Sequence, residues 1–294
     1  MQHALDADRA AVEAALRALC AHGLAPLPAA LREAIGYSLL GTGKRLRPLL
    51  VLAAYRACGG TRDASALAAA VEVVHAYSLV HDDLPCMDDD DVRRGRPTTH
   101  RLYGTAVATA AGVAMVPVAA RAAAEAARAL ELPDRAVGAI VGELMRASGA
   151  GGMVGGQLLD LDAEGRTLTL PELERVHRAK TGALIAASVR IGGIAARAGG
   201  ARAEALARYG EAVGLAFQIA DDVLDATATT AQLGKTAGRD AARGKRTYPA
   251  LLGVDGARER ADALAILGCA ALREAALLTP ELECLAHFAV ERSS

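Results

Sequence analysis

Two groups of aspartates, far apart in the chain, are the residues best suited to chemistry. The first group holds Asp82, Asp83 and the run 88–91, and the second holds Asp221, Asp222 and Asp225, one helical turn after Gln218. Asp221 and Asp225 are four residues apart and share one helix face, where like charges repel. Hard oxygen donors without His or thiolate partners are typical of Mg²⁺, which completes its shell with water and substrate phosphates. The sequence therefore predicts magnesium sites that hold a phosphorylated ligand.

The first aspartate group needs a break in regular helix geometry. Apolar residues dominate 71–80, so Asp82 and Asp83 are expected at the end of a buried helix, where unpaired charge is costly. Asp82 and Asp88 are six residues apart and would diverge on an ideal helix. We expect a kink at Pro85 to bring the two carboxylates together. The alternative is a solvated acidic turn, which the preceding apolar run disfavours.

Lysines and arginines supply candidate phosphate-binding groups. Lys44, Arg45 and Arg47 follow two glycines and precede an apolar run, and cations near a helix N-terminus tend to need an anion. The glycine spacing is wrong for a nucleotide-binding P-loop. Further cations stand at Arg93, Arg94, Lys180, Lys235 and Lys245. Together they predict one anion site for metals with phosphate and a second for phosphate alone; the alternative at residues 44–47 is a solvated basic helix start.

The amino-acid composition and the spacing of glycine and proline breaks indicate the fold that must hold these residues. The chain has 294 residues, of which 52% are hydrophobic and only 3% aromatic, and alanine is abundant, which favours helices over strands. Apolar residues recur at helical spacing, glycine and proline breaks are short, and no linker divides the chain. We therefore expect an all-α, single-domain helical bundle over residues 1–294, with both aspartate groups facing a central active-site cavity.

Charge and cysteine content restrict the partners and the compartment. The formal net charge is -1, so nucleic acid is not an expected partner. Five scattered cysteines favour reduced thiols and a cytoplasmic protein, and the N-terminus lacks a signal-peptide pattern. The uncharged stretch 102–120 is long enough to span a membrane. Because Ala, Gly and Thr dominate it, we expect instead a helix buried within the protein and no membrane span.

Motifs spread along the whole chain resemble one family. They are the segments 43–48, 75–91 with Arg93-Arg94-Gly95, 151–157 with Asp160, His177 with Lys180-Thr181, 217–225, 233–235 and 245–249. Two aspartate motifs in this order, with these flanks, resemble the trans-prenyltransferases, in particular bacterial-type farnesyl diphosphate synthases and other short-chain prenyl diphosphate synthases. The resemblance implies a homodimeric enzyme that joins isopentenyl diphosphate to an allylic diphosphate, either dimethylallyl or geranyl diphosphate.

The same resemblance implies a role for each matching residue. Asp82, Asp88 and Asp221 are the implied magnesium ligands, with three Mg²⁺ ions per active site and Mn²⁺ as a substitute. Further implied catalytic residues are Asp83, Asp222, Asp225, Lys180 and Gln218. Allylic-substrate contacts are implied for Arg93, Lys180, Thr181, Gln218, Lys235 and Lys245, and isopentenyl diphosphate contacts for Lys44, Arg47, His75 and Arg94. Gln157 and Asp160 are expected near the reacting carbons, and Asp89 and Asp90 at the solvated rim.

Two of these roles have a plain structural alternative when the residues are taken alone. His75 on an apolar segment is more often a satisfied core histidine than a ligand. Gln157 and Asp160, three residues apart, could equally be a polar pair that faces a water-filled core.

Product length depends on the depth of the cavity. Tyr77 and Ser78 precede the first motif, and an aromatic residue five positions before it resembles a floor that stops growth at about fifteen carbons, since each further isoprene unit needs roughly 6 Å. This implies farnesyl diphosphate, with geranyl or geranylgeranyl diphosphate as alternatives. Val113 and Thr105 stand where many relatives carry an acidic residue. These two departures are either neutral in helix packing or alter the shape of the cavity.

Two other classes of protein compete with this interpretation. A class I terpene cyclase also ionises prenyl diphosphates with magnesium, but it lacks a second substrate site and usually carries an Asn/Ser/Glu metal motif in its second half. The all-aspartate second group and the basic run 44–47 disfavour it. A non-catalytic subunit of a partner synthase is expected to lose metal ligands, and this sequence keeps them.

Overall fold

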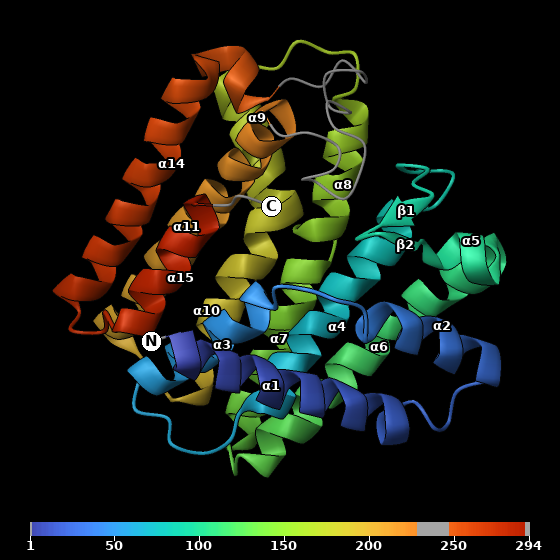
Figure 1. The fold of residues 1–294 in the computed structure, drawn as a ribbon. Helices are drawn as coiled ribbons and strands as arrows, with labels where there is room; N and C mark the ends of the chain where they lie inside the picture. Colours follow the sequence, from blue (N-terminus) through green and yellow to red (C-terminus); the bar gives the residue numbers. More distant parts are fainter. Residues whose placement is uncertain (1, 228–246, 292–294) are drawn as a thin grey trace.

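Helices make up most of the chain that the structure describes. The computed structural model describes residues 2–227 and 247–291 (Figure 1). Its first half contains α1 (Gln2–Ala18), the π-helical turn η1 (Leu19–Gly23), α2 (Ala29–Leu39), α3 (Leu46–Ala57), α4 (Ser65–Asp82), β1 (Val92–Arg93), β2 (Arg96–Pro97), α5 (Thr99–Tyr103), α6 (Thr105–Ala129) and α7 (Asp134–Ser148). Its second half contains α8 (Met153–Asp162), α9 (Leu170–His177), the π-helical turn η2 (Arg178–Gly182), α10 (Ala183–Ala195), α11 (Gly200–Thr227), α14 (Tyr248–Glu274) and α15 (Pro280–Val290). The all-α prediction is confirmed.

Two helices form the centre of the bundle. In α4, residues on nearly every side are buried, and the helix packs against α1, α3 and α6. In α10, which packs against α3, α7 and α11, ten of the thirteen residues are buried. A helix that is apolar on all sides needs neighbours all round it, so the remaining helices surround these two (Figure 1).

Small residues set the distances between the helices. A Cβ atom on Gly192 of α10 would lie 2.4 Å from the backbone oxygen of Val51 in α3. A Cβ atom on Gly210 of α11 would lie 2.8 Å from Cα of Ala186 in α10. Both contacts are shorter than a side chain allows, so glycine is required at these crossings. The Ala- and Gly-rich composition therefore fixes close helix packing as well as helix formation.

The first aspartate group lies at the end of α4, as predicted, but the predicted kink at Pro85 is wrong. The helix ends at Asp82 and the chain continues as turns. A residue before proline is disfavoured in helical conformation, so the helix stops instead of bending through Pro85. The turn still brings the aspartates together, because the backbone N–H of Asp88 donates to the backbone oxygen of Asp82 at 2.8 Å.

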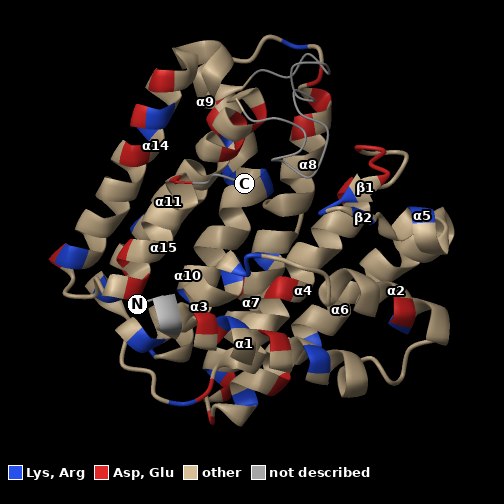
Figure 2. Cartoon of the chain, viewed as in Figure 1, with Lys and Arg blue, Asp and Glu red and all other residues tan. Residues whose placement is uncertain are grey.

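The uncharged stretch 102–120 is divided between two helices. Gly104, with a φ of 83°, separates α5 from α6. By length and composition α6 is the one helix in the described ranges that could cross a membrane, which is weak evidence, and 39% of its most apolar window is buried against the rest of the bundle. The expectation of a helix buried within the protein holds only in part, because one face is open and Val113 on it is 61% exposed. The charged residues of α6 lie in its C-terminal part (Figure 2).

Candidate active site

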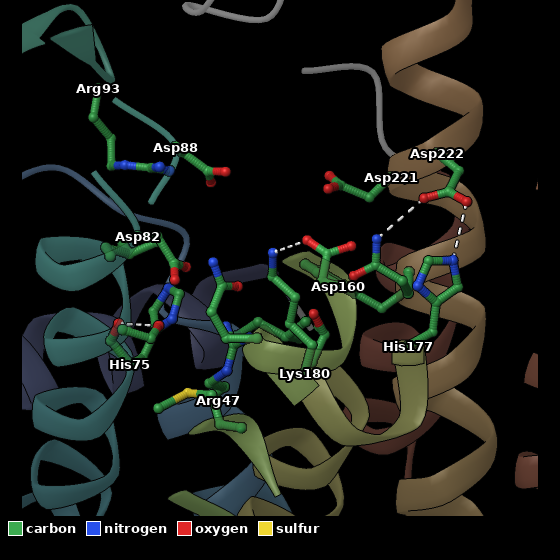
Figure 3. A pocket seen from close by; sticks show the side chains of 18 of the residues that line it. Arg47, His75, Asp82, Asp88, Arg93, Asp160, His177, Lys180, Asp221 and Asp222 are labelled. Atoms are coloured by element: carbon green, nitrogen blue, oxygen red, sulfur yellow. Dashed lines mark hydrogen bonds and ion pairs between the residues drawn. The ribbon is translucent and has the colours of Figure 1, made fainter. Parts of the chain in front are cut away.

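A cavity of about 610 Å³ lies between the end of α4 and the C-terminal third of α11 (Figure 3). Asp82, Asp88 and Arg93 lie on one side of it, and Asp221 and Asp222 lie across from them, with Lys180 and Asp160 between. The two aspartate groups, which are more than a hundred residues apart in the chain, therefore face a common pocket.

Most of the predicted site residues line this cavity, and a few do not. The lining includes Lys44, Arg47, His75, Ser78, Asp82, Asp88, Arg93, Arg94, Gln157, Asp160, Lys180, Thr181, Gln218, Asp221 and Asp222. Asp83, Asp225 and Tyr77 are outside the lining. Asp90, which we expected at the solvated rim, also lines the cavity. Its Oδ2 lies 3.7 Å from Nη2 of Arg93. Lys235 and Lys245 lie outside the described residues.

The acidic wall on α4 combines a cavity-facing carboxylate with a buried one. Burial raises the pKa of Asp82 to about 6; Lys180 opposes this rise and the like charge of Asp88 adds to it. Asp83 is only 3% exposed and accepts a hydrogen bond from Nε of Arg93 at 2.7 Å. Asp83 thus holds Arg93, which itself lines the cavity, so its contribution to the site is made through Arg93.

The acidic wall on α11 repeats this arrangement. Asp222 is 3% exposed and accepts hydrogen bonds from Nε2 of His177 at 3.1 Å, from the backbone N–H of Tyr248 at 3.1 Å and from Nε2 of Gln218 at 3.2 Å. These donors come from α9, from the start of α14 and from α11 itself. Asp222 is therefore a junction between three helices. Both Asp222 and its less buried neighbour Asp221 line the cavity.

Between these walls, α8 and η2 meet at very short range. A Cβ atom on Gly156 would lie 2.1 Å from the backbone nitrogen of Lys180, so glycine is needed where these elements touch. The π-helical turn η2 carries Lys180 and Thr181 into the cavity, in agreement with the frequent use of such turns at functional sites. Nζ of Lys180 binds Oδ2 of Asp160 at 2.7 Å.

The charge on Lys180 is held by its acidic neighbours. Burial alone would lower the pKa of Lys180, but Asp160, Asp82 and Asp88 outweigh burial and raise it. The amide of Gln157, also on the cavity wall, has both polar atoms buried without a hydrogen-bond partner among the described residues. A polar ligand or water in the cavity would satisfy this amide.

Cations and a histidine also line the cavity, and we call this set the basic end; its His75 stands two helical turns before Asp82 on α4. The set consists of Lys44, Arg47, Arg94 and His75. The two phenylalanines of the chain support two of these cations: Nζ of Lys44 lies 5.5 Å from the ring centre of Phe288, and Cζ of Arg47 lies 6.0 Å from that of Phe217.

Burial and the neighbouring arginines determine the protonation state of His75. Burial, with the charges of Arg47, Arg94 and Arg93, lowers its pKa well below the usual value. The imidazole is therefore neutral at physiological pH in this structure, and it can donate one N–H to an anion.

The donor set fits magnesium that is shared with a phosphorylated substrate. No group of three His, Cys, Asp or Glu side chains within the described ranges could hold a metal ion by itself. Carboxylate oxygens instead lie on both sides of the cavity, and the raised pKa of Asp82 reflects burial and like-charge repulsion that a cation would relieve. Magnesium takes one or two carboxylates and completes its shell with phosphates and water, so carboxylates on two walls suit it.

Glu72 and Phe288 line the cavity but had no place in the sequence-based interpretation, and His177 stood there only in a motif without a role. Arg45, which the sequence grouped with the candidate phosphate-binding cations, donates instead to Glu13 and Glu72. A usable signal existed for Glu72, which is a lone acid among buried valines at 71–74. No local sequence pattern predicts that Phe288 lines the cavity, because its contact with Lys44 depends on how α15 packs.

Fold and site together define a helical enzyme that handles a phosphorylated substrate between two acidic walls and one basic end. A polyprenyl synthetase family model matches residues 28–276. The chain is 49% identical over 278 residues to farnesyl diphosphate synthase of Escherichia coli (strain K12), covering 92% of this chain and 93% of that protein. The chain belongs to the polyprenyl synthetase family, and it is a short-chain trans-prenyltransferase.

Solved structures agree with this assignment. An FPP/GFPP synthase from Zymomonas mobilis superimposes with a TM-score of 0.82 at 36% identity, covering 99% of this chain and 100% of the other. A geranyltransferase from Helicobacter pylori, solved in complex with magnesium and isoprenyl diphosphate, gives a TM-score of 0.74 at 31% identity, covering 88% and 86%. The family thus includes a member that binds the metal predicted from the aspartates.

Proposed function

We propose that this enzyme condenses isopentenyl diphosphate with dimethylallyl or geranyl diphosphate, within one domain that spans residues 1–294, and that farnesyl diphosphate is its main product. The observation that supports the proposal is that one cavity is lined both by carboxylates, at Asp82, Asp88 and Asp221, and by cations, at Lys44 and Arg47. Two diphosphates need two such places, one shared with metal and one made of cations alone.

The allylic substrate is placed between the acidic walls. Its C–O bond breaks, the electron pair leaves with the diphosphate, and an allylic cation remains. Lys180, Arg93 and Thr181 lie where they can donate hydrogen bonds to the departing oxygens and stabilise their charge. Magnesium held by Asp82, Asp88 and Asp221, proposed as three ions per site, would supply further positive charge to this leaving group, and Mn²⁺ would replace it. Lys235 and Lys245 are proposed to assist from outside the described residues.

Isopentenyl diphosphate is placed at the basic end. Lys44, Arg47, Arg94 and neutral His75 bind its diphosphate and direct its double bond toward the allylic cation. The double bond forms the new carbon–carbon bond, and proton loss to the released diphosphate restores an alkene, so no separate basic residue is needed. Apolar side chains exclude water that would quench the cation, namely Leu79, Met153, Leu168, Leu173 and Val176.

A product assay tests this function directly. Purified protein would be incubated with isopentenyl diphosphate, each allylic primer in turn and Mg²⁺, and the products would be dephosphorylated and separated by chromatography. We expect a fifteen-carbon alcohol from geranyl diphosphate, and no product when EDTA removes the metal. Turnover that persists without divalent metal would contradict the metal assignment, and cyclic hydrocarbon formed from farnesyl diphosphate alone would favour a terpene cyclase.

We further propose that the enzyme is a cytoplasmic homodimer in which α6 meets its counterpart in a second copy. Apolar residues are exposed along one face of this helix, including Ala106, Ala110, Val113 and Pro117. An apolar face of this length on a soluble chain is typical of a surface covered by a partner. Light scattering should give the mass of two chains for the wild type and of one chain for Val113→Glu. A wild-type mass of one chain would contradict the dimer.

A further inference from the structure

Arg45 lies between the cations of the basic end but makes its contacts inside the protein. The residue is 4% exposed. Its Nε donates to Oε1 of Glu13 at 2.7 Å, and Nη1 donates to Oε1 of Glu72 at 2.8 Å. Its Nη2 donates to the backbone oxygens of Leu39 at 3.1 Å and Gly41 at 2.7 Å. One guanidinium therefore joins α1, α4 and the segment that follows α2.

The backbone at Arg45 is held in an unusual conformation. Its φ of 52° and ψ of 31° place it in the left-handed region, directly before α3 begins. Residues with a Cβ atom adopt this region rarely, and they keep it only where surrounding contacts enforce it. The four hydrogen bonds of the side chain are such contacts. The conformation of Arg45 therefore fixes how Lys44, just before it, and Arg47, just after it, are oriented relative to each other.

The partner Glu72 ties this turn to the opposite wall. Glu72 is 2% exposed and stands one helical turn before His75 on α4, and both residues line the cavity. The bond from Arg45 to Glu72 thus fixes the distance between the segment that carries Lys44 and the helix that carries His75. A charge-assisted bond between two buried groups is strong and directional, which suits it to this task.

We propose that Arg45, through Glu72, is a positioning residue for the isopentenyl diphosphate subsite, which holds Lys44, Arg47 and His75 in register to receive one diphosphate. The inference rests on the proposed function. Its specific consequence is selectivity between the two substrates. η2 and α11, which carry Lys180 and Asp221 of the allylic subsite, make none of the four bonds of Arg45, and Asp82 lies ten residues after Glu72 on α4. Lysine would not replace Arg45, since one ammonium cannot reproduce the forked geometry of four bonds.

The test compares variants of the network with a matched control. Arg45→Lys keeps the charge and loses the fork. Glu72→Leu removes the acceptor, while Glu72→Gln keeps an acceptor oxygen at the same place. The control is Arg56→Met: Arg56 also ties α3 to α1, through two bonds to Asp8 at 2.9 and 2.6 Å, but it is outside the cavity lining.

Two measurements distinguish positioning from mere support of the fold. Steady-state kinetics would vary each substrate with the other at saturation, and calorimetry would measure isopentenyl diphosphate binding without magnesium. For Arg45→Lys and Glu72→Leu we expect the KM for isopentenyl diphosphate to rise about tenfold or more and the calorimetric affinity to fall in parallel, while the KM for geranyl diphosphate stays within about twofold. Glu72→Gln should restore most of the affinity, and Arg56→Met should leave both KM values unchanged.

The outcomes separate this inference from the function on which it rests. A wild-type protein without condensing activity would overturn the proposed function. A wild-type protein that is active, with variants whose two KM values are unchanged or rise equally, would overturn the positioning role alone. If Arg45→Lys fails to fold, the pair Glu72→Gln and Glu72→Leu decides: equal isopentenyl diphosphate affinity in the two, or failure of both to fold, would make the network a support of the fold only.

Discussion

Neighbouring aspartates on α11 should differ sharply when each is replaced by alanine. Asp221 lines the cavity, and its proposed task is to hold magnesium. Asp222 is buried and accepts three hydrogen bonds from His177, Tyr248 and Gln218. We expect Asp221→Ala to abolish most activity at little cost in stability. Asp222→Ala should reduce both, because it removes the junction between α9, α11 and α14.

The size of the difference follows from these contacts. Three hydrogen bonds to a buried carboxylate, at about 1 kcal/mol each, together with the donors left unsatisfied, give a loss of about 3–5 kcal/mol in the free energy of unfolding for Asp222→Ala. At roughly 2 °C per kcal/mol for a chain of this size, the Tm should fall by about 6–10 °C. Asp221→Ala should change the free energy of unfolding by less than about 1 kcal/mol. Loss of one electrostatic contact to the transition state should lower its kcat about a hundredfold.

Urea unfolding followed by circular dichroism would measure the free energy of unfolding, and steady-state kinetics with both substrates and Mg²⁺ at saturation would measure kcat. Asp222→Asn is a useful intermediate, since its amide keeps one acceptor oxygen and should recover part of the stability. Equal unfolding free energies for Asp221→Ala and Asp222→Ala would refute the junction at Asp222. A kcat for Asp221→Ala close to that of the wild type would refute the metal-binding task of Asp221.

Three further predictions test other parts of the site. Asp82→Ala should lower kcat at least about a hundredfold and Asp89→Ala by less than about threefold, because only Asp82 lines the cavity; equal kinetic losses would remove the distinction. Gly156→Ala should reduce both expression and kcat, since its Cβ would lie 2.1 Å from the backbone of Lys180; crystals with η2 unmoved would contradict this. Tyr77 lies outside the lining but packs, partly buried, next to Ser78, which lines the cavity, so Tyr77→Ala should deepen the cavity and lengthen the product beyond fifteen carbons; chromatography without longer chains would reject Tyr77 as the floor.

Features governed by local sequence could be predicted, and features governed by packing could not. The end of α4 at the aspartates follows from the apolar run 71–80, and the stop before Pro85 follows from local sterics that the expected kink ignored. The exposed face of α6 was missed, because an Ala-rich segment has the same composition whether bundle or partner covers it. The side chain of Arg45 points into the protein because it binds Glu13 on α1 and Glu72 on α4, which are far from it in sequence, so this direction could not be predicted locally.

Helix geometry explains why the two aspartate pairs share one design. Consecutive helical residues point about 100° apart, so two adjacent aspartates at a cavity edge face it unequally. In each pair the first, Asp82 or Asp221, lines the cavity. The second, Asp83 or Asp222, is only 3% exposed and accepts a hydrogen bond from a side chain of another segment, Arg93 or His177, although Asp222 also reaches the cavity lining.

A buried carboxylate is costly unless it is paired, so each second aspartate requires its partner. Each partner also lines the cavity. Because the two aspartates of a pair are adjacent, the bond made by the second also fixes where the first lies relative to Arg93 or His177. One aspartate could bind metal, but this fixed arrangement needs both.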